Sequence, residues 1–129
     1  MMEILFRGKR ATNGDWVYGD FVHGNERKSL RDSIFVYDSE TQSFNDYEIN
    51  PSTLGQYTGL TDKNGKKVFE GDIIRKTNKG RHPEIFIANI RTCFYTNEEV
   101  YYGPFDHFTE SCEYEIIGNI TDNPELLEK

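Results

Sequence analysis

The sequence contains no long apolar segment. No run approaches the roughly 20 apolar residues that a membrane-spanning helix requires. The N-terminal stretch MMEILFRGKR carries Glu3 and has no small-residue cleavage site, so it does not have the pattern of a signal peptide. We therefore expect no membrane association and a cytoplasmic location.

Cysteine and histidine are also scarce. The two cysteines, Cys93 and Cys112, are nineteen positions apart, which matches neither a CxxC motif nor a zinc-site spacing. Without a secretory signal they are expected to be reduced thiols. The three histidines, His23, His82 and His107, are far apart in polar surroundings. The sequence therefore predicts no metal site and no cofactor.

The best helix formers are rare. The chain has six Leu and two Ala, against eleven Ile, nine Phe, eight Tyr and one Trp among its 129 residues. β-Branched and aromatic side chains suit a pleated, half-buried surface, and eleven Gly provide turns. This composition predicts a mainly β protein.

The net charge is −7, and it is unevenly distributed. Residues 1–50 carry −3, residues 51–91 carry +4 and residues 92–129 carry −8. An acidic protein repels phosphate at long range, which disfavours non-specific nucleic-acid binding. The simplest interpretation of the basic middle segment is that the acidic last third neutralises it within the fold.

The N-terminal part is predicted to be a β-rich segment, residues 1–51. Two strands are joined through Asn13-Gly14, a dipeptide that suits a type I′ hairpin turn. The stretch SIFVYD is a further short strand, and residues 39–54 are turn-rich and contain Asn50-Pro51. We place the main boundary near residues 50–55.

Residues 52–129 are predicted to form a second domain. Short strands are expected around QYTGL, KKVFE, GDII and CEYEIIGNI, and the longest is expected over residues 84–95. Asn64-Gly65 predicts a hairpin turn, and Pro124 with Glu125 predicts a short C-terminal helix. Short strands with tight turns indicate an SH3-like β-barrel or roll.

The glycine-rich stretch GQYTGLTDKNGKKVFEGDII does not fit a chemical site. A phosphate-binding P-loop needs four residues between its glycines and a Ser or Thr after the lysine, whereas Lys66 is followed by Lys67. A calcium loop starting at Asp62 has Ile73 at its twelfth position, where a glutamate is required. Glu113 and Glu115 share a predicted strand face, but a solvated face explains them better than paired acid–base catalysis. We expect no catalytic residues and no enzymatic activity.

The candidate interaction surface is the basic stretch RKTNKGRH, which precedes the strand predicted from residue 84. It could contact phosphate or an acidic partner, or it could be a solvated connection between strands. The candidate partner-binding residues are Arg75, Lys76, Lys79 and Arg81.

Three stretches together, LFRGKRATNGDWVYGDFV, PSTLGQYTGLTDKNGKKVFEGDII and IIGNITDNPELL, resemble the YopX family of bacteriophage and prophage proteins. The resemblance runs across nearly the whole chain and is weaker over residues 30–50 and 77–110. It implies an SH3-type barrel beginning near residue 52 and a phage-derived product in a bacterial cytoplasm, with no established reaction. The leading hypothesis is a non-enzymatic accessory protein that binds another protein. The alternative is a nucleic-acid-associated small barrel that uses residues 75–82.

Overall fold

The computed structural model describes residues 3–25, 31–78, 82–89 and 112–127. In these ranges the chain is mainly β, as predicted, with antiparallel strands β1–β9 and the short 3-10 helices η2 and η3. It divides into an N-terminal unit, residues 1–56, and a C-terminal unit, residues 57–129. The division falls five residues after the predicted end of the first segment at 51, because the first residues of β5 pair with β1.

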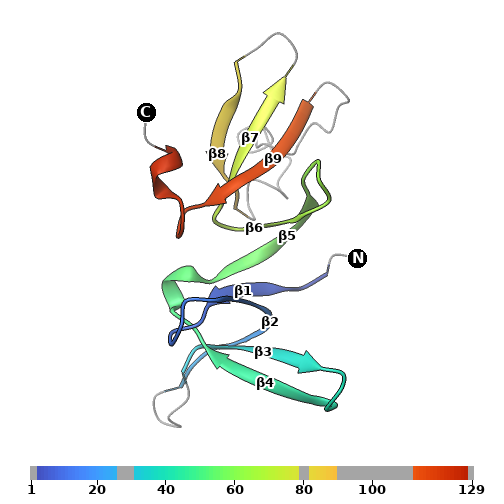
Figure 1. Ribbon diagram of the computed structural model, residues 1–129, viewed down its shortest axis with the longest axis vertical. Helices are drawn as coiled ribbons and strands as arrows, with labels where there is room; N and C mark the ends of the chain where they lie inside the picture. The colour runs from blue at the N-terminus through green and yellow to red at the C-terminus, as the bar shows by residue number, and fades with distance from the viewer. Residues whose placement is uncertain (1–2, 26–30, 79–81, 90–111, 128–129) are drawn as a thin grey trace. The chain divides into compact units, whose positions relative to one another are not determined.

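The N-terminal unit is an antiparallel sheet with the strand order β4-β3-β2-β1-β5, and its first four strands are drawn side by side in Figure 1. An isolated bridge between Arg10 and Ile49 joins the chain after β1 to the chain after β4. β5 belongs to this unit only through Gly55 and Gln56, which pair with Arg7 and Phe6. The elements are β1 (Phe6–Lys9), β2 (Trp16–Val22), β3 (Ser33–Asp38), β4 (Ser43–Glu48), η2 (Pro51–Thr53) and β5 (Gly55–Thr61).

One face of this sheet holds the core of the N-terminal unit. Ile34 and Ile49 are almost fully buried, at 0% and 2% exposed. Gly8 leaves the space that Ile49 fills, since a Cβ on Gly8 would lie 2.7 Å from the Ile49 Cδ1 atom. Because Gly8 has no side chain, Ile49 can pack directly against the backbone of β1.

The first hairpin differs from the predicted turn type. Gly14 has a φ of 75°, but Asn13 is not among the residues with positive φ, which a type I′ turn requires at both central positions. The Arg10 N–H donates to the Asp15 carbonyl, and the Gly14 N–H donates to the Arg10 carbonyl. The connection is therefore longer than a two-residue turn. Arg10 and Asp15 close the loop, and Gly14 adopts the positive φ that other residues rarely take.

Residues 39–54 were predicted to be turn-rich, and turns do occupy residues 39–42, but the prediction missed β4. β4 pairs with β3 over its full length, from Ser43 opposite Asp38 to Glu48 opposite Ser33. The sequence SFNDYE has three polar residues that favour turns locally, and pairing with the more apolar β3 overrides that preference.

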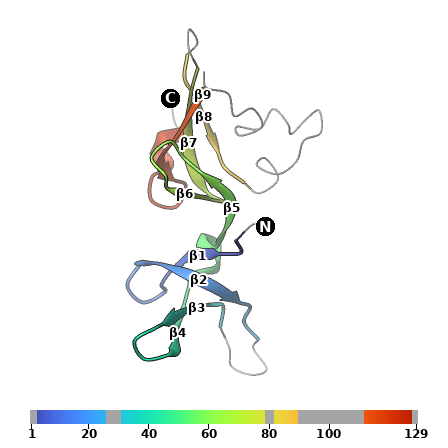
Figure 2. The same ribbon diagram turned by 90° about the vertical axis from the view of Figure 1, so that its right-hand side faces the viewer.

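The C-terminal unit contains a β5–β6 ladder and the sheet β8-β7-β9, whose strands lie side by side in Figures 1 and 2. The ladders between described strands form open sheets, not a closed barrel, so the SH3-like topology stays a prediction. The predicted C-terminal helix is a single 3-10 turn. The elements are β6 (Lys67–Phe69), β7 (Asp72–Asn78), β8 (Glu84–Ile87), β9 (Cys112–Asn119) and η3 (Pro124–Leu127).

The core of this unit joins β6, β7 and β9 to the end of β8. Its buried members are Val68, Ile74, Ala88 and Tyr114. The strand predicted over residues 84–95 is shorter than expected: β8 ends at Ile87, and residues 90–95, including Cys93, lie outside the described residues.

No helix within the described ranges is long and apolar enough to cross a membrane.

Candidate functional site

The predicted basic stretch is only partly described. Arg75 and Lys76 lie in β7, whereas Lys79 and Arg81 fall outside the described residues. The Arg75 guanidinium donates a hydrogen bond to Glu115 Oε1 at 2.5 Å. The Lys76 ammonium lies 5.9 Å from the centre of the Tyr114 ring. The two described members of the candidate surface therefore already have partners on β9.

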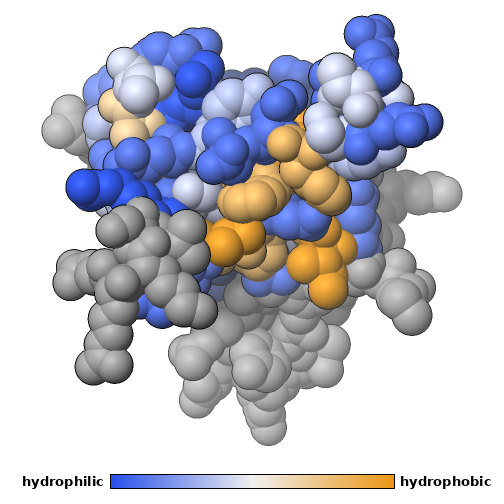
Figure 3. All heavy atoms as spheres, turned by 90° about the horizontal axis from the view of Figure 1, so that it is seen from below, coloured by the Kyte–Doolittle hydropathy of each residue, from blue (hydrophilic) through white to orange (hydrophobic). Residues whose placement is uncertain are grey.

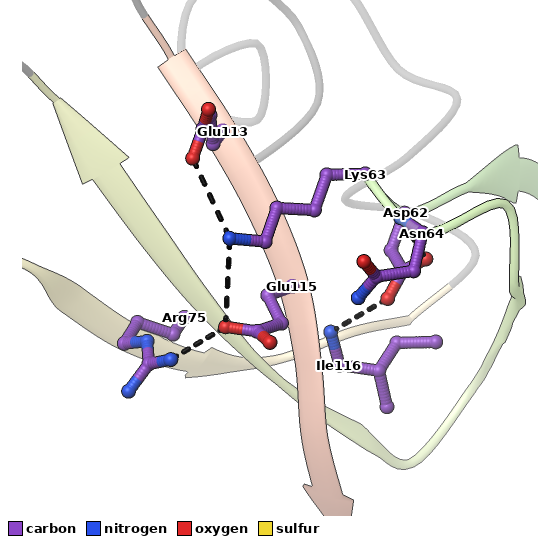
Figure 4. Close-up of polar contacts among 7 residues, drawn as sticks. All are labelled: Asp62, Lys63, Asn64, Arg75, Glu113, Glu115 and Ile116. Atoms are coloured by element: carbon purple, nitrogen blue, oxygen red, sulfur yellow. Dashed lines mark hydrogen bonds and ion pairs between the residues drawn. The ribbon is translucent and has the colours of Figure 1, made fainter.

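Asp62 organises the hairpin turn between β5 and β6 (Figure 4). Its side chain is buried, and the residue is 6% exposed. One carboxylate oxygen accepts hydrogen bonds from the Asn64 and Lys66 N–H groups, both at 2.9 Å, and the other accepts from the Ile116 N–H at 3.1 Å. The Lys63 N–H also donates to the Tyr114 carbonyl at 2.8 Å. The turn is thereby fastened to β9.

The electrostatics of Asp62 follow from these donors. Burial by itself raises the pKa of the carboxyl group, but the backbone N–H groups of Ile116, Lys66 and Asn64 stabilise the carboxylate. Together they hold the pKa of Asp62 below its ordinary value of 3.8. Asp62 is therefore a charged structural acceptor at neutral pH.

Two glutamates on β9 bind cations of the same unit (Figure 4). The Lys63 ammonium lies 3.5 Å from Glu113 Oε2 and 4.0 Å from Glu115 Oε1. The hydrogen bond from Arg75 lowers the pKa of Glu115, partial burial opposes it, and Lys63 adds to the lowering. A general acid at neutral pH needs a raised pKa, so the lowered pKa of Glu115 is the opposite of what that role requires. Acidic residues of the last third thus neutralise basic residues of the middle segment at these positions.

The N-terminal unit has an open pocket of about 480 Å³. The His23 Nδ1 atom lies 3.1 Å from Asp32 Oδ1, but the imidazole is 83% exposed. The same Asp32 oxygen accepts a hydrogen bond from the Gly24 N–H at 2.5 Å. The aspartate therefore shapes the chain at the end of β2, and the exposed imidazole is not held in a desolvated position. The lining residues are His23, Gly24, Arg31, Asp32, Glu48, Ile49 and Pro51.

An exposed aromatic surface on β3 and β4 was not predicted from the sequence. Tyr37 and Phe44 are each 54% exposed, although they are large apolar side chains. They are paired across the two strands, and their rings meet edge to face with centres 5.2 Å apart. Phe35 continues the row, with its ring centre 6.5 Å from that of Phe44. Seen from below, where β3 and β4 lie in Figure 1, apolar side chains gather among polar ones (Figure 3).

Carboxylates border these rings on the same face of the sheet. Residues directly opposite each other in antiparallel strands share a face. Asp20 on β2 and Asp46 on β4 both lie opposite Phe35, and Glu48 lies two positions beyond Asp46. We call this surface the acidic–aromatic face; it comprises Asp20, Phe35, Tyr37, Phe44, Asp46 and Glu48.

The comparisons with known proteins establish the family. The family model described as "YopX protein" matches residues 5–128, nearly the whole chain. No curated protein matches. Among solved structures, the chain is similar to the crystal structure of protein EF1440 from Enterococcus faecalis, at 21% identity and a TM-score of 0.50, covering 99% of this chain and 100% of that one. At this identity the likeness concerns the fold alone. The chain belongs to the YopX family.

Proposed function

We propose that this chain is a non-enzymatic accessory protein of a phage or prophage that acts in the bacterial cytoplasm by binding another protein. The observation that carries the proposal is the acidic–aromatic face, where Tyr37 and Phe44 are more than half exposed beside carboxylates. Exposed aromatic side chains on a well-ordered sheet are a common feature of protein interfaces.

The charge of the chain supports a protein partner over nucleic acid. The net charge is −7, and the described basic residues Arg75 and Lys76 contact Glu115 and Tyr114. A cation that already neutralises a carboxylate contributes less to phosphate binding. The nucleic-acid alternative depends on Arg75, Lys76, Lys79 and Arg81 acting together.

The proposal also includes the fold of the C-terminal part of the chain. We infer an SH3-like roll for residues 52–129, supported by the succession of short strands β5 to β9 and by the tight turn at Gly65, where φ is 81°. The phage origin and the cytoplasmic location depend on the general character of the family.

Affinity capture from a bacterial lysate, with and without nuclease, tests this function. A protein partner that remains after nuclease treatment is the expected result. A partner lost on nuclease treatment, together with binding to DNA or RNA that collapses between low and physiological salt, would support the nucleic-acid alternative instead. Replacing Arg75 or Lys76 with an uncharged residue is not expected to change which protein partner the capture retains.

A further inference from the structure

The acidic–aromatic face ends at an edge of its sheet. In the strand order β4-β3-β2-β1-β5, β4 ends the sheet. Its last residue is already met from the outer side, where the Ala11 N–H donates to the Glu48 carbonyl at 2.9 Å beside the bridge between Arg10 and Ile49. From Ser43 to Tyr47, no described strand pairs with this edge. Five of the six residues of β4 are exposed, and Tyr47 is intermediate. An edge strand presents unpaired backbone N–H and C=O groups, which a further extended chain can use for hydrogen bonds.

The charge of this region is mainly negative, and the nearest cation in the sequence, Arg31, lies 4.0 Å from Glu48 Oε2. Residues 32–62 contain six Asp or Glu and no Lys or Arg. The β3–β4 hairpin, residues 33–48, has four of these carboxylates and therefore a charge of −4, contributed by Asp38, Glu40, Asp46 and Glu48. Such a surface repels phosphate groups and attracts cationic side chains.

We propose that the acidic–aromatic face binds an extended segment of a partner protein that carries Arg or Lys at alternate positions and adds to the edge of β4. This inference rests on the proposed function, because it names the chemistry of the partner that the function requires. It also names the binding surface, which the family assignment does not.

The geometry of β4 sets the spacing of the basic residues. Side chains on one face of a strand recur every second residue, about 6.8 Å apart. Asp46 would therefore lie opposite one cation of an added strand, whereas Glu48, two residues later, already lies 4.0 Å from the Arg31 Nε atom. Phe44, two residues before Asp46, would meet the next such side chain. Charged pairs across neighbouring strands stabilise a sheet, and they also fix its register.

The aromatic members suit arginine in particular. Guanidinium groups bind to the faces of aromatic rings, and they can pair with a carboxylate at the same time. The N-terminal unit already uses this contact twice: the Arg10 guanidinium lies 4.6 Å from the Tyr47 ring centre, and that of Arg7 lies 4.7 Å from the Trp16 ring centre. Tyr37 and Phe44 offer the same chemistry on the exposed surface.

A labelled peptide tests the proposal with the full chain. The probe is a fluorescein-labelled decapeptide of alternating Arg and Val, and binding is followed by fluorescence polarisation at low and physiological salt. We expect binding to the wild type, and about tenfold weaker binding to Asp46→Lys. The matched control is Asp15→Lys, which changes the net charge equally at an exposed loop of the same unit. It should change affinity less than about twofold.

The location of the bound peptide provides a second measurement. Amide chemical-shift changes in the ¹⁵N-labelled chain should concentrate in residues 33–48. A peptide of the same composition with its five Arg in one block should bind several-fold more weakly, because the alternate spacing is lost. Equal weakening by the two lysine variants, or shifts concentrated elsewhere, would overturn the proposal.

Other occupants would be recognised by separate results. Self-association that Asp46→Lys abolishes would identify a second copy of the chain and overturn the proposed partner class, as would stronger binding of a labelled oligothymidylate than of the peptide. If lysate capture retains a protein partner equally with wild type and Asp46→Lys, this inference fails and the proposed function stands. If the peptide binds as expected but capture retains no protein, the proposed function fails instead.

Discussion

The two hairpins β3–β4 and β5–β6 use acidic residues in opposite ways. In the C-terminal unit, Asp62 lies at the turn and accepts three backbone hydrogen bonds, including one from Ile116, 54 positions away in the sequence. In the N-terminal unit, Asp46 and Glu48 lie on an exposed edge strand beside Phe44. The same residue type thus supports the fold in one hairpin and remains exposed in the other.

Burial and donors explain the difference. A buried carboxylate is tolerated only where hydrogen bonds compensate for the lost water, and Asp62 has three such donors. An exposed carboxylate keeps its hydration and contributes little to stability by itself. Substitutions of these acidic residues should therefore affect stability in the C-terminal hairpin and binding in the N-terminal one.

Gly19→Ala should have the largest effect, and it concerns the sheet that carries the acidic–aromatic face. A Cβ on Gly19 would lie 2.2 Å from the Phe35 carbonyl oxygen, a backbone atom that cannot move independently. We expect the free energy of unfolding to fall by about 3 kcal/mol, measured by urea denaturation. In Gly14→Ala, where φ is 75° and no atom lies within 4 Å, only backbone strain is added, and the loss should be about 1 kcal/mol. Similar losses of stability in Gly19→Ala and Gly14→Ala would contradict a clash at Gly19.

Asp62→Ala should follow, with a loss of about 2 kcal/mol, because three part-buried hydrogen bonds from the N–H groups of Asn64, Lys66 and Ile116 lose their acceptor. Amide hydrogen exchange at Ile116 should accelerate more than exchange in β1–β4. Asp46→Ala is the matched substitution on the other hairpin, and it should change the free energy of unfolding by less than about 0.5 kcal/mol. If the two alanine variants were equally stable, the contrast between the hairpins would be wrong.

Acid should remove part of the stabilisation that Asp62 provides. The pKa of Asp62 is below its ordinary value of 3.8 in the folded chain, so the unfolded chain binds the proton first as the pH falls. The stabilisation that the Asp62 carboxylate provides should be constant above about pH 5. It should decrease as the pH falls below the ordinary pKa and through the lower pKa of the folded chain. Comparing the unfolding of wild type and Asp62→Asn between about pH 2 and pH 7 measures it. The difference between them should narrow in acid, and a constant difference would exclude a charged Asp62.

Local rules predicted part of this structure from the sequence. Asn64-Gly65 predicts a hairpin because glycine at positive φ is a property of the turn itself, and Gly65 has a φ of 81°. The Asp72 carboxylate is a second local contact, and it accepts from the Phe69 N–H, three residues earlier, at 2.8 Å. Both features need only a few neighbouring residues.

Long-range contacts account for what the sequence did not predict. The role of Asp62 depends on the Ile116 N–H, and no local pattern indicates that pairing. β4 was missed because Ser43, Asn45 and Asp46 favour turns when read alone, and only the register with β3 makes them a strand. The one available signal for the acidic–aromatic face was the absence of Lys and Arg from residues 32–62, which includes the exposed Phe44.

Phe44→Ser should have a small effect on stability and a clear effect on binding. The side chain is 54% exposed and touches mainly Tyr37 and Phe35, so the free energy of unfolding should change by no more than about 0.5–1 kcal/mol. Loss of the ring removes the aromatic surface beside Asp46, and binding of the alternating Arg–Val peptide should weaken several-fold. Phe69→Ser is the opposite case: Phe69 is 3% exposed and packs on Tyr57, so its replacement should unfold the C-terminal unit. A Phe44→Ser protein that is as unstable as Phe69→Ser would show that the ring supports the fold; one that is stable and binds the peptide fully would remove the ring from the binding surface.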